Sequence, residues 1–329
     1  MEWESDVREL KAVGAEALGG GRVGLRIRGW EIESSKRSIL TSSLVQQWEE
    51  KLQTSHLPEM VFGESSLVLN HLSSGIKIYF NAFDALCGWK QEGLPPVEVP
   101  AAAKWKFRRV HYDERFSVFI RGKSSAEGIL INATSSISLA IPPRDLFSIS
   151  CSKATDEVIL DYDYTFTTPY CGSAGIETNP ESGRGASEEG SCSFHWEDCQ
   201  EQINMVALAS KEPILFYDEV ILYEDELGDN GVSLLTAKVR VMPSGWYLLL
   251  RFWLRVDGVL MRLRDTRFHC TFRESTEPII LREICWREDT FQALSSKGYP
   301  SDSAAYSDPD VIRERLPIIK RNTQKLSFT

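Results

Sequence analysis

Two aspartates occupy positions where a carboxylate is unexpected. Asp265 has the parity of Met261 and Leu263 along a predicted strand, so it falls on the apolar face of that strand. Asp84 lies in a segment whose other members are apolar: Phe80, Phe83, Ala85 and Leu86. A carboxylate in apolar surroundings must be paired, hydrogen-bonded or placed at the rim of an opening. Two such groups can act as paired carboxylates on a small molecule, or accept hydrogen bonds from a bound polypeptide.

Each aspartate also has a purely structural interpretation. Asp265 can lie beyond the end of its strand and cap a turn together with Thr266. Asp84 can stand at the start of a short helix capped by Asn81, where a negative charge interacts favourably with the helix dipole. The sequence leaves both interpretations open.

No catalytic, cofactor or metal motif is complete in this chain. His195-Trp-Glu197 resembles half of a zinc-deaminase signature, but no Pro-Cys-x-x-Cys follows it. Residues 19–24 match the G-x-G-x-x-G pattern of dinucleotide-binding sites, yet they lead into extended chain rather than into a helix. The seven cysteines are scattered and include no Cys-x-x-Cys pair. We therefore expect neither a cofactor nor a metal, while the absence of portable motifs is only weak evidence against catalysis.

Charge and hydropathy limit the partners of the protein. The formal net charge is -10, from 37 Lys and Arg against 47 Asp and Glu, which disfavours a nucleic-acid interface. No apolar run reaches the ~18–20 residues that cross a bilayer, and the N-terminus has no secretory pattern. An odd number of cysteines without such a signal is typical of reduced thiols. These features predict a cytoplasmic protein without membrane contact.

Hydrophobic periodicity predicts a mainly β (α+β) fold. Alternation of apolar and polar residues indicates strands at residues 25–32, 66–71, 76–81, 158–168, 214–223 and 232–242. Helical spacing and capping residues indicate short helices at residues 43–52, 82–87 and 289–296, and a further helix that opens at Ser307-Asp-Pro. These segments predict a chain rich in strands, with a few short helices.

The best hairpin signal is Asp257-Gly258 between two alternating runs. A two-residue type I′ turn there would place Val256 opposite Val259 and Arg251 opposite Arg264. One face of the hairpin would then be apolar and the other basic, with residues 224–226 as suppliers of carboxylates. The basic face is expected to be a salt-bridged outer surface, with contact to membrane or RNA as the weaker alternative.

The chain is organised as one domain with additions. Residues 1–23 are expected to form a flexible N-terminal arm, and residues 321–329 a C-terminal tail. Between them, residues 24–320 form the domain, interrupted by an atypical, serine-rich insertion at 109–155 and a flexible loop at 173–193. The insertion is an exposed addition or translated intron sequence.

Several strings in this sequence resemble the TIP-forty-one-like (TIPRL) proteins. They are His56-Leu-Pro-Glu-Met-Val-Phe-Gly63, Phe80-Asn-Ala-Phe-Asp-Ala-Leu86, Asp163-Tyr-Thr-Phe-Thr-Thr168, Tyr223-Glu-Asp-Glu-Leu-Gly-Asp-Asn-Gly-Val-Ser233 and Arg264-Asp-Thr-Arg267. The blocks occur in the family's order and cover most of residues 24–107 and 157–320. The amino-acid sequences of the N-terminal blocks are most similar to those of plant members.

This resemblance implies a fold of two packed antiparallel β-sheets with peripheral helices. It also implies a regulator of type 2A-like protein phosphatases that is not an enzyme and that acts in TOR signalling, in the cytoplasm and also in the nucleus. It implies direct binding and restraint of the phosphatase catalytic subunit, a cleft for the subunit's C-terminal tail, and contact with an alpha-four-type regulatory protein. By motif, the resemblance places partner binding at Asp84, Asp265, Ile203 and Leu263. A monomer is expected.

The residues and the resemblance together predict one groove. Asp84 and Asp265 would line it and accept hydrogen bonds, while Leu263 and Ile203 would supply apolar contact. Asp265→Asn or Asp84→Leu would then weaken phosphatase capture and leave the thermal midpoint nearly unchanged. The alternative function is a β-sandwich enzyme or small-ligand-binding protein that uses the two aspartates as paired carboxylates.

Overall fold

A computed structural model of the chain describes residues 10–54, 57–87, 90–91, 99–100, 158–159, 166–176, 194–208, 212–227, 231–273 and 278–328. The chain divides into two compact units, residues 1–90 with 168–329 and residues 91–167. In the second unit, β8 (Val99–Pro100) pairs antiparallel with β9 (Val158–Ile159). The expected insertion at 109–155 and most of the expected strand at 158–168 lie outside the described residues. The flexible loop expected at 173–193 begins instead with a strand over its first four residues, and its remainder is not described.

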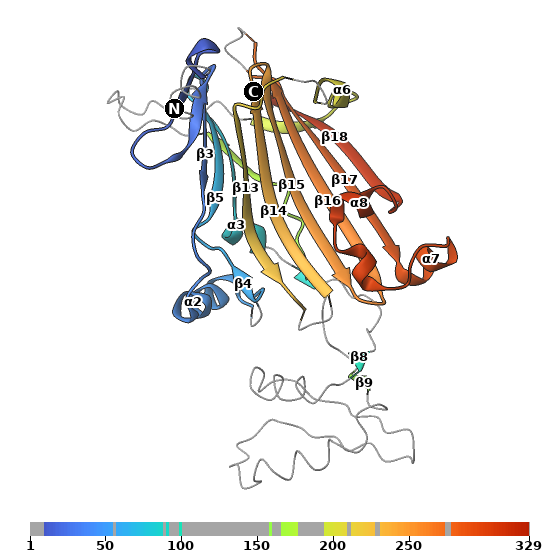
Figure 1. The fold of residues 1–329 in the computed structure, drawn as a ribbon. Helices are drawn as coiled ribbons and strands as arrows, with labels where there is room; N and C mark the ends of the chain where they lie inside the picture. The colour runs from blue at the N-terminus through green and yellow to red at the C-terminus, as the bar shows by residue number, and fades with distance from the viewer. Residues whose placement is uncertain are drawn as a thin grey trace, which may run out of the picture. The chain divides into compact units, whose positions relative to one another are not determined.

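The first unit contains two large antiparallel sheets, which confirms the predicted mainly β fold. The smaller sheet has the order β1-β2-β3-β5-β6-β11 (Figure 1). Its strands are β1 (Ala15–Ala17), β2 (Val23–Ile27), β3 (Trp30–Ser35), β5 (Ser66–His71), β6 (Ile76–Asn81) and β11 (Ser173–Ile176). Side chains of β3, β5 and β6 alternate strictly between buried and half-buried, as strands covered on one face require.

The larger sheet has eight strands in the order β12-β18-β17-β16-β15-β14-β13-β4. They are β4 (Met60–Val61), β12 (Phe194–Asp198), β13 (Phe216–Asp225), β14 (Gly231–Met242), β15 (Gly245–Val256), β16 (Leu260–Thr271), β17 (Ile280–Thr290) and β18 (Ile318–Phe328). The short strands β7 (Lys90–Gln91) and β10 (Phe166–Thr167) complete the set that the structure describes.

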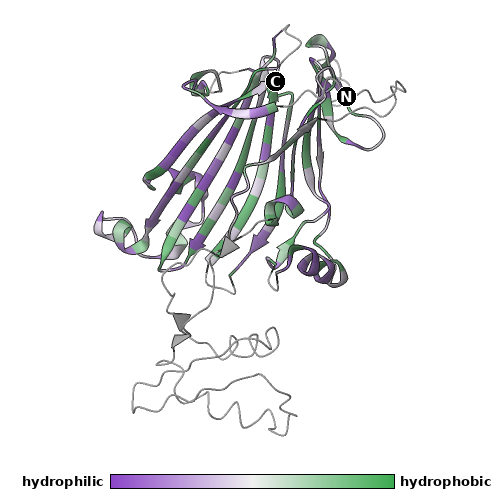
Figure 2. Cartoon of the chain, turned by 180° about the vertical axis from the view of Figure 1, so that it is seen from behind, coloured by the Kyte–Doolittle hydropathy of each residue, from purple (hydrophilic) through white to green (hydrophobic). Residues whose placement is uncertain are grey.

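Aromatic contacts join the two sheets of the first unit. Trp30 meets Trp246 edge to face at 5.1 Å between ring centroids, and Phe80 meets Phe268 at 5.6 Å. We call the face of the eight-stranded sheet that bears Trp246 and Phe268 the inner face, and the opposite face the outer face. Green and purple bands alternate along the long strands in Figure 2, because successive side chains point to opposite faces.

The hairpin of β15 and β16 differs from the predicted one by a single residue. Val256 pairs with Leu260 rather than with Val259, so the turn has three residues, with Gly258 at φ 72°. The expected pairing of Arg251 with Arg264 is therefore wrong. Arg251 stands opposite Asp265. Met261 and Leu263 keep the parity of Asp265, as predicted, but all three lie on the outer face.

Other boundaries also differ from expectation. The run at 25–32 is a hairpin rather than one strand, because Arg28 and Gly29 both take positive φ, at 48° and 79°. Part of the expected N-terminal arm pairs as β1 with β2, and residues 321–328 of the expected C-terminal tail lie in β18. Ile214 precedes β13, which begins at Phe216.

The described helices include the four that the sequence predicts, near 43–52, 82–87, 289–296 and after Ser307, and two short elements that it does not predict. They are α2 (Ser42–Leu52), α3 (Ala82–Leu86), α6 (Met205–Leu208), α7 (Phe291–Ser296), the 3-10 turn η1 (Ser303–Tyr306) and α8 (Pro309–Arg313). Asn81, Thr290 and Asp308 each accept a backbone N–H at the start of a helix. Within the described part of the chain, the model contains no helix with the length and apolar character of a bilayer span.

Two glycines provide a matched test of how tightly the β14–β15–β16 region is packed. A Cβ on Gly231, at φ 154°, would lie 1.9 Å from the carbonyl oxygen of Arg255, whereas a Cβ on Gly258 would meet nothing within 4 Å. We expect Gly231→Ala to lower the free energy of unfolding by about 3 kcal/mol or more, and Gly258→Ala by about 1–2 kcal/mol. Urea denaturation followed by tryptophan fluorescence measures both. Equal losses would contradict the close strand approach at Gly231.

Candidate functional site

Asp265 is one of the most buried charged residues described, with 2% of its surface exposed. It lies in the middle of β16, so the interpretation as a turn cap is wrong. Arg251 on the neighbouring strand donates from Nε to Oδ1 at 2.7 Å and from Nη2 to Oδ2 at 3.0 Å. The strand register places the two residues directly opposite each other. The result is a bidentate, charge-assisted pair inside the protein.

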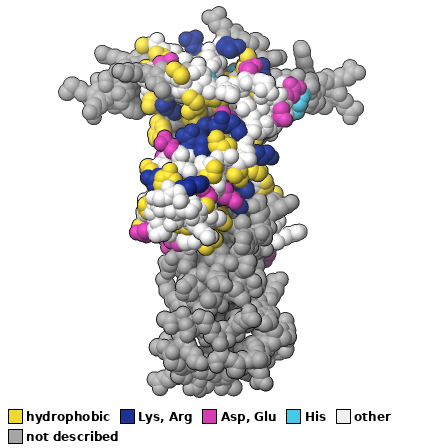
Figure 3. All heavy atoms as spheres, turned by 90° about the vertical axis from the view of Figure 1, so that its right-hand side faces the viewer, with side chains coloured by type: hydrophobic (Ala, Val, Ile, Leu, Met, Phe, Trp, Pro, Cys, Tyr) yellow, Lys and Arg dark blue, Asp and Glu magenta, His cyan; other side chains and the backbone are white. Residues whose placement is uncertain are grey.

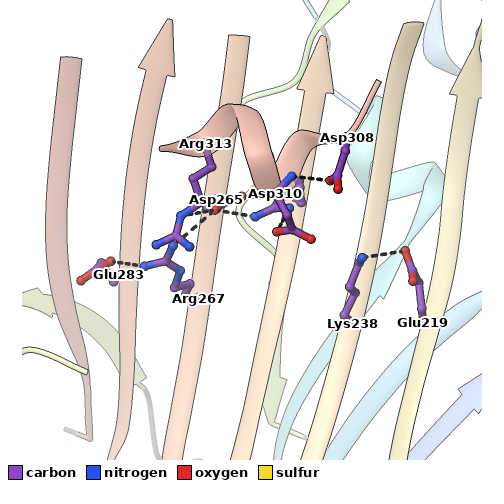
Figure 4. Close-up of polar contacts among 9 residues, drawn as sticks. Glu219, Lys238, Asp265, Arg267, Glu283, Asp308, Asp310 and Arg313 are labelled. Atoms are coloured by element: carbon purple, nitrogen blue, oxygen red, sulfur yellow. Dashed lines mark hydrogen bonds and ion pairs between the residues drawn. The ribbon is translucent and has the colours of Figure 1, made fainter. Parts of the chain in front are cut away.

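The pair continues across β16 and β17. Arg267, two residues along β16, donates from Nη2 to the same Oδ2 of Asp265 at 3.4 Å. Its Nη1 donates to Oε1 of Glu283 at 3.0 Å, and Glu283 pairs directly opposite Arg267 in the sheet. Figure 4 shows these side chains converging on the outer face.

Helix α8 closes the network from above the sheet. Arg251 donates from Nη1 to Oδ1 of Asp310 at 2.6 Å, and Nε of Arg313 lies 3.7 Å from Oδ2 of Asp265 (Figure 4). We call this group the charge cluster: Arg251, Asp265, Arg267, Glu283, Asp310 and Arg313. It contains as many carboxylates as guanidinium groups, so it carries no net charge when all six are ionised.

Burial and pairing act in opposite directions on the ionisation of the cluster. Burial alone would lower the pKa of Arg251, but its hydrogen bonds to Asp265 and Asp310 raise that pKa above the usual value. Burial would likewise raise the pKa of Asp310, yet the hydrogen bond and positive charge of Arg251 hold it below the usual value. Burial and the nearby Arg267 lower the pKa of Arg313. The partners therefore keep Arg251 and Asp310 ionised at neutral pH.

The two apolar residues of the predicted site flank the charge cluster but are themselves buried. Leu263 is 0% exposed, in a core cluster whose other members are Trp253, Met261, Phe291, Leu294, Tyr306, Ile312 and Leu316. That cluster is covered by α7, η1 and α8. Ile203 is 5% exposed and packs with Met242, Tyr247 and Leu281. Neither side chain is available for a partner unless its covering element moves.

Asp84 occupies a different and more accessible setting. It is half-buried in the first turn of α3, and its own N–H donates to Oδ1 of Asn81 at 2.8 Å, so the helix-start interpretation is confirmed. Its Oδ2 accepts from Oγ of Ser173 at 2.7 Å and from Nδ2 of Asn81 at 3.1 Å. Within the described residues its Oδ1 accepts no hydrogen bond, so one oxygen is left to receive a further donor.

The two aspartates lie on opposite sides of the eight-stranded sheet. Arg264, next to Asp265, points to the inner side and donates to the carbonyl of Thr168 at 3.3 Å. Thr168 in turn donates to the carbonyl of Ala85 in α3 at 2.6 Å, which places α3 on the inner side. In Figure 1, α8 passes in front of the C-terminal strands, whereas α3 is seen behind β13 and β14. The expectation of one groove lined by Asp84 and Asp265 is therefore wrong.

The same separation removes the geometric basis for paired-carboxylate chemistry. A cavity on the inner face, lined by Tyr170, Arg264 and Trp286 among others, has a volume of about 10 Å³. That is room for about one water molecule. In the part of the chain that the structure describes, no group of three or more His, Cys, Asp or Glu side chains could hold a metal ion.

Sequence reasoning missed four members of the charge cluster. Arg267 and Glu283 follow from the strand parity of Asp265 once the neighbouring strand is recognised. Asp310 and Arg313 belong to a helix that packs back against the sheet. Asp310 lies 59 residues beyond Arg251 in the chain. The expected suppliers at 224–226 are not the partners of Arg251, because the three-residue turn places Asp265 directly opposite it.

The fold and the site define a two-sheet, mainly β protein whose outer face is closed by a buried charge cluster. The sequence matches the TIP41-like family over residues 60–295. It is 58% identical to a TIP41-like protein of Arabidopsis thaliana over 329 residues, which cover 100% of this chain and 99% of that relative. The chain belongs to the TIP41-like family, and the resemblance seen in the sequence is confirmed.

More distant relatives also match over most of this chain. A TIP41-like protein of Homo sapiens is 32% identical over 300 residues, 91% of this chain and 87% of the relative. The protein named type 2A phosphatase activator TIP41 in Saccharomyces cerevisiae is 33% identical over 309 residues, 92% of this chain and 74% of the relative. The family match includes the positions of all four predicted binding residues.

Burial changes the outcome expected for Asp265→Asn. Loss of the carboxylate leaves Arg251 and Arg267 buried beside a neutral amide, which costs about 3–5 kcal/mol of folding free energy. The thermal midpoint should therefore fall, in contrast to the expectation from sequence. Asp257→Asn is the matched control, since Arg255 Nε donates to Asp257 Oδ1 at the same 2.7 Å on a partly exposed pair. We expect it to cost less than about 1 kcal/mol.

Chemical denaturation of the two variants and of wild type measures this difference. Similar stability of Asp265→Asn and Asp257→Asn would show that the charge cluster contributes no more than a surface ion pair.

Proposed function

We propose that this protein binds the catalytic subunit of type 2A-like protein phosphatases and regulates its activity without catalysing a reaction itself. The observation that carries the proposal is the relationship to the yeast protein named type 2A phosphatase activator TIP41, at 33% identity over 92% of this chain. A relative from Schizosaccharomyces pombe has the corresponding name and is 24% identical over 91% of this chain.

Among the four predicted binding residues, Asp84 is the best placed for direct contact. It is half-buried, has an acceptor oxygen with no hydrogen bond among the described residues, and belongs to a short helix with a defined cap. A backbone N–H or a basic side chain of the phosphatase can donate to that oxygen. Asp265, Leu263 and Ile203 are buried, so we propose that they act by holding the outer face in shape.

The finer proposals concern the effect on the phosphatase and the setting. We propose that the bound protein restrains the catalytic subunit, receives its C-terminal tail, and acts as a monomer in TOR signalling together with an alpha-four-type protein. The proposed location is the cytoplasm, with the nucleus as a second site. Two fungal relatives are named activators, so the sign of the effect is the first property to measure.

Asp84→Asn tests the contact with little disturbance of the fold. The amide keeps the size of the side chain and can still accept from Ser173, but it loses the charge that a donor on the phosphatase would meet. We expect binding to a purified type 2A catalytic subunit to weaken at least about tenfold, equivalent to about 1.4 kcal/mol. Biolayer interferometry provides the affinity, and thermal denaturation should show a nearly unchanged midpoint.

Asp302→Asn is the matched control, because Asp302 likewise stands at the start of a short helical turn, η1, where its carboxylate accepts the N–H of Ala304. Its affinity should stay within about twofold of wild type. If wild type itself does not bind the catalytic subunit, the proposed function is wrong. If wild type binds and Asp84→Asn binds equally well, only the assignment of Asp84 is wrong. Phosphatase activity on a phosphopeptide, with and without the bound protein, then decides between restraint and activation.

A further inference from the structure

The outer edge of β18 is only partly covered. β18 runs over eleven residues, but β12 pairs only with its last five, from Gln324 to Phe328. The chain then makes one more backbone hydrogen bond, from the N–H of Cys199 to the carbonyl of Thr323 at 2.9 Å, and leaves the edge for the packing site of Ile203. The side chain of Asn322 donates to Oδ1 of Asp198 at 3.0 Å. Among the described residues, no strand pairs with residues 318–322 on this side. Figure 1 shows β18 as the outermost long strand of the sheet.

The backbone of this open edge has a defined direction. Thr323 points its carbonyl toward the β12 side, and successive residues of a strand alternate in the side to which their N–H and C=O point. Arg321 therefore directs its N–H and C=O outward, away from β17. The N–H and C=O of Asn322 point the other way, into the ladder with β17. An outward, unpaired N–H and C=O pair is a template for an added strand.

The side chains of the open edge are apolar and basic. Ile318 and Ile319 are 43% and 59% exposed, and Lys320 and Arg321 are exposed. Arg321 has neither ion pair nor hydrogen bond within the described part of the chain, and Lys320 lies over the ring of Trp286 at 4.7 Å. Figure 3 looks at this side of the molecule and shows Lys and Arg side chains gathered near its centre.

The charge of β18 is opposite to that of the whole protein. Its sequence, IIKRNTQKLSF, contains three basic residues and no acidic one, in a chain of net charge -10. A second copy of the same strand is a poor partner, because antiparallel pairing of the two edges would bring like charges together. The register shift between Trp286 and Arg287, which leaves Ile319 as an extra residue, further discourages flat edge-to-edge association.

We propose that residues 318–322 of β18 form a second docking site, which takes an acidic segment of a partner protein in extended conformation. The segment adds a strand to the eight-stranded sheet, exchanges backbone hydrogen bonds with Arg321, and places carboxylates against the side chains of Lys320 and Arg321. Its apolar residues cover Ile318 and Ile319. This site lies at the sheet edge and does not depend on the phosphatase contact proposed at Asp84.

A short, end-blocked peptide in which two adjacent glutamates are joined to two adjacent valines is the probe, because the neighbours Lys320 and Arg321 point to opposite faces of the sheet. Added to the isotope-labelled full chain at physiological salt, it should slow hydrogen exchange of the Arg321 amide by at least about tenfold. The amide of Asn322, already paired with β17, should show no comparable change. The corresponding peptide of lysine and valine should produce neither effect.

Substitutions separate charge from strand pairing. Arg321→Glu should weaken binding of the acidic peptide at least about tenfold, whereas Lys325→Glu, in the part of β18 that β12 covers, should stay within about twofold. Arg321→Ala keeps the outward N–H and Arg321→Pro removes it, and proline is tolerated where the N–H faces solvent at a sheet edge. The proline variant should therefore bind at least about fivefold more weakly than the alanine variant.

Three results would overturn the proposal. Equal affinity of the alanine and proline variants, without protection of the Arg321 amide, would show attraction by charge alone and no added strand. Equal binding of the acidic and basic peptides would remove the charge selection. Protection of the Arg321 amide in the absence of peptide, together with a dimer in sedimentation, would assign the edge to a second copy of this chain.

Discussion

The salt bridge between Arg251 and Asp265 is the interaction on which the larger sheet depends. Both charges are buried, so each would be strongly destabilising without the opposite charge beside it. The two side chains meet only in the register that pairs Val256 with Leu260. A slip by one residue would oppose Arg251 to Arg264 and exchange the inner and outer faces of β16. The pair therefore selects one register among those that an Asp-Gly turn permits.

The same bridge couples the sheet to the helices at the C-terminal end. Asp310 and Arg313 of α8 reach down to Arg251 and Asp265, and the helix covers the apolar cluster around Leu263. Charge and hydrophobic burial thus act on the same element. A change at Asp265 or Leu263 would therefore disturb the packing of α8 on the outer face.

Three regions of the eight-stranded sheet then differ in what they offer a partner. The inner side carries α3, where Asp84 keeps one free acceptor oxygen among the described residues. The outer side presents α8 and the segment around Ile203. The edge at β18 presents backbone that no strand among the described residues pairs with, together with basic side chains. Because the three regions lie apart on the fold, a substitution in one can be tested without changing the other two.

Strand parity and capping residues were readable in the sequence: Met261, Leu263 and Asp265 share a face, and Asn81 begins a helix, because both features depend only on near neighbours in the chain. The length of the turn could not be read from the sequence, since Asp-Gly suits loops of two or three residues. The difference of one residue decides which residue stands opposite Arg251. Sequence also could not show that Asp84 and Asp265 lie on opposite sides of a sheet, or that β12 stops short along β18. These facts depend on packing between segments far apart in the chain, and only the tertiary structure decided them.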